Sequence, residues 1–187
     1  MLNNDEDAQV KIPSEDVIEE YKRLVMERHP LLTDVWMTMD GLKLRLQQSP
    51  HTAIQARFYN GWTCDHYVSN VLGFSPAASS GTIVVACVNV PGTVHDSMVC
   101  YWGNIYDQLE IVYERTGGRC TVDSAFSEDR CPFFIKSSNQ LPDNPDDLAI
   151  QEQAKSMRQS AEWGMRSFQS SFPRVKDRFI YEETGWG

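Results

Sequence analysis

Four successive segments rich in β-branched and aromatic residues dominate the first half of this sequence, and they require a sheet. Each segment is bounded by Gly, Pro, Asn or Ser, which is the pattern of a strand between turns. The four segments are residues 35–46, 51–58, 67–74 and 82–90. Because the run 83–88 is apolar on both faces, it is predicted to be an interior strand of the sheet.

The second half of the sequence has helical periodicity. Thr93 and Asp96 have the spacing of a capping box, so a helix is predicted from there to the Gly117-Gly118 pair. The remaining predictions are helices at residues 14–28 and 148–171 and short strands at residues 119–122 and 132–136. Strands followed by helix, strand and helix predict an α/β domain, with a mixed sheet flanked by helices.

Composition excludes several classes of protein. A chain of 187 residues, 41% of them apolar, suits one domain with a sizeable core. Its longest apolar stretch, at residues 83–90, falls far short of the roughly 20 residues that span a bilayer, so no membrane partner is expected. Five cysteines without a CxxC pair are predicted to be reduced thiols of an intracellular protein. The net charge is −9, and only residues 151–187, with six basic and five acidic residues, carry a positive excess.

Three acidic residues in three different local settings are the candidate catalytic residues. Asp40 and Asp123 each close an apolar run, and Glu162 lies within the long predicted helix. Strand-end carboxylates on neighbouring strands meet at one edge of an α/β sheet. Two such carboxylates and one from a helix can hold two hard cations for in-line attack on a phosphate.

Each of these acids also has a plain structural interpretation. Asp40 precedes Gly41 and could be a turn residue, and Asp123 could cap a turn together with Ser124. Glu162 lies four residues from Arg158 and from Arg166, which is the spacing of surface ion pairs on a helix. The motifs around the acids, taken together, favour the metal site.

Those motifs resemble the nuclease domain of PIF/Harbinger-type transposases and their domesticated relatives, which are DDE superfamily endonucleases. The matching pieces, in the family's order and spacing, are residues 39–41, 91–97, 122–126, 161–164 and 172–179. The resemblance implies a ribonuclease H-like fold, with Asp40 on the first strand, Asp123 at the end of the fourth and Glu162 on a late helix. It also implies Mg²⁺ or Mn²⁺ as the metal, DNA as the substrate and the nucleus as the location.

In such enzymes a metal-activated water cuts the strand, and the freed 3′-OH can attack target DNA. Basic side chains near the site are expected to contact the DNA phosphates, the alternative being a solvated basic face. The candidates are Lys155, Arg158, Arg166, Arg174, Lys176 and Arg178. The family often uses a separate Myb-like DNA-binding partner, and such a partner is expected here too.

The expected domain organisation is an acidic tail with one helix (1–34), the DDE nuclease domain (35–179) and a truncated C-terminal end (180–187). Truncation leaves open a second function, in which a domesticated or degenerate relative binds partners or DNA without cutting. A phosphatase with Asp40 as nucleophile is disfavoured, because no second aspartate follows two residues later.

Two further groups of residues invite a functional interpretation. His95 and Asp96 resemble a catalytic dyad, but their position favours a helix cap for Asp96 and a place at the sheet edge for His95. Tyr59, Trp62 and His66 could contact DNA, although aromatic residues beside a turn more often serve packing.

Overall fold

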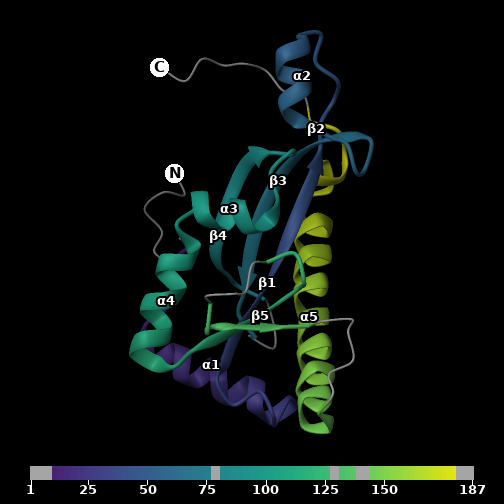
Figure 1. The fold of residues 1–187 in the computed structure, drawn as a ribbon. Coiled ribbons are helices and arrows are strands. Elements are labelled where there is room, and N and C mark those ends of the chain that lie inside the picture. The colour runs from purple at the N-terminus through teal and green to yellow at the C-terminus, as the bar shows by residue number, and fades with distance from the viewer. Residues whose placement is uncertain (1–9, 77–80, 127–130, 138–143, 180–187) are drawn as a thin grey trace.

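A mixed sheet with helices on both faces forms the protein in the computed structural model, which describes residues 10–76, 81–126, 131–137 and 144–179 (Figure 1). The elements are α1 (Glu15–Arg28), β1 (Val35–Arg45), α2 (Thr52–Phe58), β2 (Tyr59–Asn60), β3 (Asp65–Phe74), β4 (Ile83–Pro91), α3 (Asp96–Trp102), α4 (Ile105–Thr116), β5 (Arg119–Val122), β6 (Phe134–Lys136), α5 (Pro145–Ser171) and the 3₁₀ helix η2 (Pro173–Lys176). The expected acidic tail at residues 1–9 and the C-terminal end at 180–187 lie outside the described residues.

Five strands lie in the order β4-β3-β1-β5-β6, and the two-residue β2 pairs with the start of β3. β1, β3 and β4 form an antiparallel meander, whereas β5 and β6 run parallel to β1. Parallel strands need a crossover, and the α3–α4 connection between β4 and β5 supplies it. This arrangement confirms the predicted fold class, a ribonuclease H-like mixed sheet flanked by helices.

Alternation along β1 divides the core into two layers. Met37 and Met39 pack toward α1, α3 and α4, in the larger cluster of buried side chains. Leu42 packs on the opposite face, against Ala161 and Met165 of α5. Successive side chains of a strand point to opposite faces. Asp40 therefore shares its face of β1 with Leu42, the face that α5 covers (Figure 1).

Two of the strand predictions are wrong in an instructive way. Residues 51–58 form the helix α2 rather than a strand, and Phe58 is its buried residue. β4 is not an interior strand, because among the described residues it pairs with β3 alone. Its apolar character on both faces comes from helices instead: Val84 and Val85 belong to the α3–α4 side of the core, and Ile83 packs on the α5 side.

The predicted capping box and the single helix after it are also wrong. The Thr93 hydroxyl donates to the carbonyl of Arg57 at 3.2 Å, and the helix begins only at Asp96. Gly103 and Asn104 then divide the predicted helix into α3 and α4. Gly103 lies so close to Cys87 that a Cβ would be 2.8 Å from the Cys87 Sγ, and Asn104 adopts a left-handed φ of 53°.

The other predicted elements match the structure closely. α1 occupies the predicted range, and Gly117, with a φ of 67°, ends α4. α5 starts three residues earlier than predicted because the Asn144 side chain accepts a hydrogen bond from the Asp146 amide at 3.2 Å. All five cysteines are free, and no helix among the described residues is long and apolar enough to cross a membrane.

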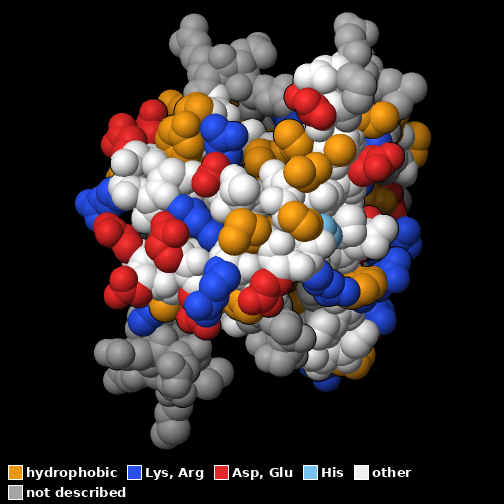
Figure 2. Space-filling view, turned by 90° about the horizontal axis from the view of Figure 1, so that it is seen from below, with side chains coloured by type: hydrophobic (Ala, Val, Ile, Leu, Met, Phe, Trp, Pro, Cys, Tyr) orange, Lys and Arg blue, Asp and Glu red, His pale blue; other side chains and the backbone are white. Residues whose placement is uncertain are grey.

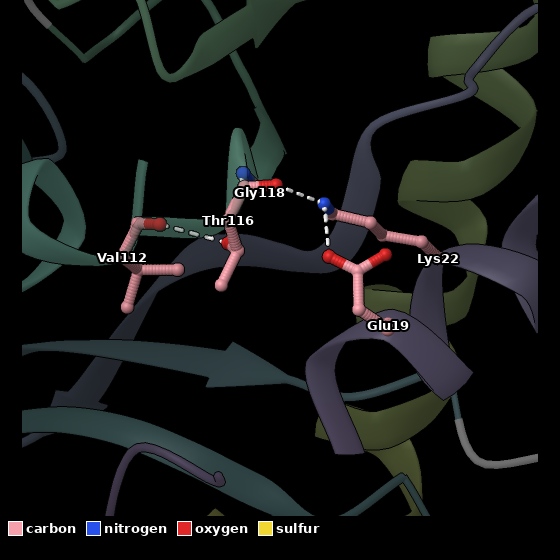
Figure 3. A network of polar contacts seen from close by, with 5 residues as sticks. All are labelled: Glu19, Lys22, Val112, Thr116 and Gly118. Carbon is pink, nitrogen blue, oxygen red and sulfur yellow. Dashed lines mark hydrogen bonds and ion pairs between the residues drawn. The ribbon is translucent and has the colours of Figure 1, made fainter. Parts of the chain in front are cut away.

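A buried lysine joins α1 to the end of α4 (Figure 3). The Lys22 ammonium donates to the Thr116 carbonyl and to Glu19 Oε1, the second contact at 2.7 Å. Thr116 in turn donates from its hydroxyl to the Val112 carbonyl at 2.8 Å, and the Thr116 hydroxyl oxygen accepts from the Gly118 amide at 3.1 Å. A cation at the C-terminal carbonyls of α4 also complements the helix dipole.

Replacing Lys22 with Met is expected to destabilise the protein by about 1–3 kcal/mol, because a helix-terminal carbonyl loses its partner in a buried setting. Chemical denaturation followed by circular dichroism measures this loss. Arg23→Met on the exposed side of α1 is the matched control and is expected to change stability by less than about 0.5 kcal/mol. Equal losses in the two variants would contradict the role assigned to Lys22.

Candidate active site

The pairing of β1 with β5 places two of the predicted acids side by side. The two strands are parallel, and Thr38 lies opposite Thr121 in their register. Asp40 and Asp123 each follow two residues later, so both side chains leave the chain on the same side as those threonines. Burial raises the pKa of Asp40, and the negative charge of Asp123 adds to the rise, in agreement with this placement.

The two acids differ in their local backbone. Asp40 is not at a strand end, because β1 continues to Arg45 and Asp40 pairs with Leu72 of β3. Asp123 does follow the end of β5, where its Oδ1 accepts a hydrogen bond from the Ala125 amide at 2.8 Å. Asp40 is therefore held by a continuous strand and Asp123 by a tight turn.

Asp96 places a further carboxylate beside β1, over Gly41 and therefore on the opposite face of the strand from Asp40, a position that the sequence interpretation as a helix cap missed. It is the first residue of α3, and the N-cap is His95, which makes no side-chain capping hydrogen bond. Its carboxyl group lies directly over Gly41, where a Cβ would be 2.7 Å from the Asp96 Cγ. Glycine at position 41 thus makes room for Asp96. In the sequence, the Asp40-Gly41 pair was the signal that a side chain could approach the strand here.

Burial and the charges of neighbouring acids raise the pKa values of Asp40 and Asp96. Burial raises the pKa of Asp40, and the neighbouring charges of Asp123 and Asp96 raise it further, against a hydrogen bond from the Gly41 amide and the charge of Arg158. Burial also raises the pKa of Asp96, with Asp123 adding to the rise and Lys43 opposing it. The site therefore holds excess negative charge in a partly desolvated setting.

Glu162 lies at the level of Asp40 on α5, but its side chain points elsewhere. Its neighbour Ala161 packs against Leu42, two residues after Asp40. The helix also lies very close to the sheet there, since a Cβ on Gly164 would be 2.8 Å from the Phe74 ring. The Glu162 carboxylate is 51% exposed and pairs with Arg166 at 4.0 Å.

Arg158, one helical turn before Glu162, occupies the side of α5 that faces the acids. Its Nη1 donates to the Ser137 hydroxyl at 3.0 Å, and its charge acts on Asp40. Its Nε is buried without a hydrogen-bond partner. Because residues four apart share one face of a helix, Glu162 projects from the same flank as Arg158.

Among the described residues, no three His, Cys, Asp or Glu side chains are grouped so that they could hold a metal ion. The donor chemistry nevertheless fits a hard divalent cation, because the acids are oxygen donors, and burial followed by neighbouring negative charge raises the pKa of Asp40. Only Glu162 is turned away. Its exposed ion pair is worth about 0.3–0.5 kcal/mol, so a rotation toward Asp40 costs little.

The six predicted DNA-binding residues do not form one surface. Lys155, Arg174 and Lys176 are exposed, whereas Arg158 points to the acids and Arg166 pairs with Glu162. Arg178 has a structural partner: it makes two hydrogen bonds of 2.8 Å to Asp65 and one of 3.1 Å to the Leu46 carbonyl. Figure 2, seen from below Figure 1, shows acidic and basic side chains interspersed on that face rather than a continuous basic patch.

Comparison with known proteins decides the family. A sequence model of the DDE superfamily endonucleases matches residues 39–184, most of the chain. The chain belongs to the family of DDE superfamily endonucleases. The matched region of this DDE endonuclease contains Asp40, Asp123 and Glu162, and it also contains Asp96. No curated protein and no solved structure matches the chain significantly.

In this DDE endonuclease, Gly41→Ala is expected to destabilise the fold by about 1–3 kcal/mol, because the new methyl group collides with the Asp96 carboxyl. In an Asp96→Ala background the same substitution should cost much less, since the collision is gone. Urea denaturation of the four proteins measures this coupling. Gly61→Ala, where a Cβ meets nothing within 4 Å, is the control, and strict additivity would contradict the proposed contact.

Proposed function

We propose that this DDE endonuclease cuts DNA phosphodiester bonds with divalent metal ions held by Asp40, Asp123 and Glu162, as a PIF/Harbinger-type transposase nuclease. The observation that carries the proposal is the parallel pairing of β1 with β5, which puts Asp40 beside Asp123 on the face covered by α5. Asp96 lies over Gly41, across β1 from Asp40, and its charge adds to the negative charge around Asp40, so we include it among the residues that favour cation binding.

Mg²⁺ or Mn²⁺ bound there would polarise a phosphate oxygen, favour deprotonation of water and stabilise the leaving alkoxide. The protein's own contribution is orientation. The Gly41 amide holds one oxygen of Asp40 at 2.9 Å, and the Ala125 amide holds one oxygen of Asp123 at 2.8 Å. Each carboxylate therefore keeps a fixed direction and presents its second oxygen to a cation.

Arg158 is the side chain best placed to receive the scissile phosphate. Its charge acts on Asp40, and only Nη1 of its guanidinium donates to Ser137, so further N–H donors remain for a phosphate. A guanidinium can bind a phosphate with two parallel hydrogen bonds. Arg158 would thus hold the phosphate against the acids, while Lys155, Arg174 and Lys176 remain available for contacts along the DNA backbone.

A second candidate function is binding of partners or DNA without cutting, as in a domesticated transposase-derived protein. The outward Glu162–Arg166 ion pair favours it, because the third predicted acid then has a structural role. The two functions differ in one property: a non-cutting protein keeps its affinity for DNA but gives no product when metal is added.

The charge of the chain supports a partner for DNA recognition. With a net charge of −9 and no continuous basic patch on the face in Figure 2, the protein is expected to have weak non-specific affinity for DNA. We propose that a Myb-like DNA-binding partner brings it to specific ends, and that it acts in the nucleus, where this substrate is found.

Purified protein with Mn²⁺ is expected to nick supercoiled DNA. Asp123→Asn is expected to lower the nicking rate by more than about 100-fold. Losing a residue that only orients a metal ligand costs about 10–100-fold, and losing the ligand itself should cost more. Agarose gels of the relaxed product measure the rate. Asp107→Asn, an exposed acid on α4, is the matched control and should nick like the wild type. If Asp123→Asn nicks as fast as Asp107→Asn, the site is elsewhere; if no protein nicks but all bind DNA, the non-cutting function holds.

Metal binding gives a second prediction that does not depend on cleavage. Mn²⁺ at 100 times its dissociation constant should stabilise the wild-type fold by about 2.7 kcal/mol. Asp40→Asn and Glu162→Gln should each reduce this metal-dependent gain, although Asp40→Asn is expected to stabilise the metal-free protein by relieving repulsion. Thermal unfolding at increasing Mn²⁺ measures the gain, with Glu152→Gln on α5 as the control. An undiminished gain in Glu162→Gln would show that Glu162 is not a ligand.

A further inference from the structure

Trp62 is almost entirely exposed, which is unusual for the largest side chain. It lies in the turn between β2 and β3 and is 94% accessible to solvent, more than any other large apolar side chain in the described residues. Of the three aromatic residues near this turn, His66 is buried and Tyr59 is 42% exposed. Packing therefore accounts for His66 but not for Trp62.

The turn that presents Trp62 is tightly held. The Asn60 side-chain oxygen accepts hydrogen bonds from the amides of Trp62 and Thr63 at 3.1 and 3.2 Å. The Asn60 amide group donates to the Gly92 carbonyl at 2.8 Å, which ties the turn to the segment before Asp96. The tryptophan is thus presented by an ordered turn, so less conformational entropy is lost when something binds it.

Trp62 forms one wall of a pocket of about 460 Å³, a volume within the range of about 300–1,000 Å³ typical of small-molecule sites. The other walls that matter here are Tyr59, Lys43 and His95. The Tyr59 ring is itself supported by the buried His66 ring, with centroids 5.3 Å apart. The pocket therefore combines two aromatic side chains with an ammonium group and an imidazole.

This pocket lies on the face of β1 that carries Asp96, across the strand from Asp40. Lys43 follows Asp40 by three residues on β1, so it points to the opposite face, and its charge acts on the Asp96 carboxyl. His95 lines the pocket and directly precedes Asp96. A nucleotide in the pocket is thus within reach of both the aromatic wall and Lys43, and β1 separates it from a phosphate held by Asp40 and Asp123.

We propose that the pocket binds an unpaired nucleotide of the DNA substrate, with its base stacked on Trp62 and its phosphate beside Lys43. Aromatic faces stack on any base, and the ammonium group complements the phosphate charge. A base inside a duplex is already stacked on both sides, so the pocket selects DNA that is single-stranded or locally opened. The inference rests on the proposed DNA substrate and adds a substrate-positioning element to it.

The test measures equilibrium binding of the full chain in EDTA, by fluorescence anisotropy, so that no cutting occurs. Two single-stranded probes of equal length are used: an oligothymidylate, and an abasic strand that keeps the phosphates but has no bases. Trp62→Ala is expected to weaken binding of the oligothymidylate by about tenfold and to leave binding of the abasic strand unchanged. Trp62→Phe, which keeps an aromatic face, should retain most of the affinity.

Trp102→Ala is the matched control, because Trp102 is 57% exposed on α3 and lies outside the pocket. The inference is overturned if Trp62→Ala binds the oligothymidylate as Trp102→Ala does, or if it loses equal affinity for both probes. It is also overturned if Trp62→Ala changes only self-association in sedimentation, which would make Trp62 a contact between two copies. Wild-type protein that binds neither probe would count against the proposed DNA substrate as well, whereas binding that is insensitive to Trp62 leaves the nuclease proposal intact.

Discussion

The parallel pairing of β1 with β5 is the constraint on which the site depends. It brings together two aspartates that are separated in the chain by the whole β3–β4 meander and the α3–α4 crossover. A slip of one residue in this register would turn Asp123 to the opposite face of the sheet. The buried Thr38 hydroxyl, which donates to the Thr121 carbonyl at 3.4 Å, lies at the last paired position and marks the register directly before the acids.

The acidic side chains near this strand pairing destabilise the metal-free protein. Asp40, Asp96 and Asp123 repel one another in a half-buried setting, and Arg158 and Lys43 offset only part of that repulsion. Such a cluster is unfavourable for folding alone and favourable for binding a cation or a phosphate held by one. The same two basic residues approach the acids from opposite sides, Arg158 from α5 and Lys43 from the pocket that Trp62 lines.

Close packing of α5 on the sheet connects the fold to the chemistry. Ala161 and Gly164 are small, so the helix approaches Leu42 and Phe74 closely and carries Glu162 to the level of Asp40. One flank of α5 then serves the site through Arg158 and Glu162, while the adjoining face belongs to the core. The position of Glu162 along the sheet is thus determined by packing, and the direction of its side chain by a weak surface ion pair that is easily exchanged.

The sequence by itself determined the strands at residues 35–46, 67–74 and 119–122 and the long α5 helix, because hydrophobic periodicity is a local property. Short motifs, which are also local, made Asp40, Asp123 and Glu162 the candidate site residues. Tertiary structure alone decided that 51–58 is a helix, that β4 is an edge strand covered by helices, and that Asp96 lies over Gly41. It also paired Arg178 with Asp65 and left Trp62 exposed while burying His66. In each of these cases the partner is distant in sequence, and neither propensity nor spacing contains information about which distant surface will cover a residue or neutralise its charge.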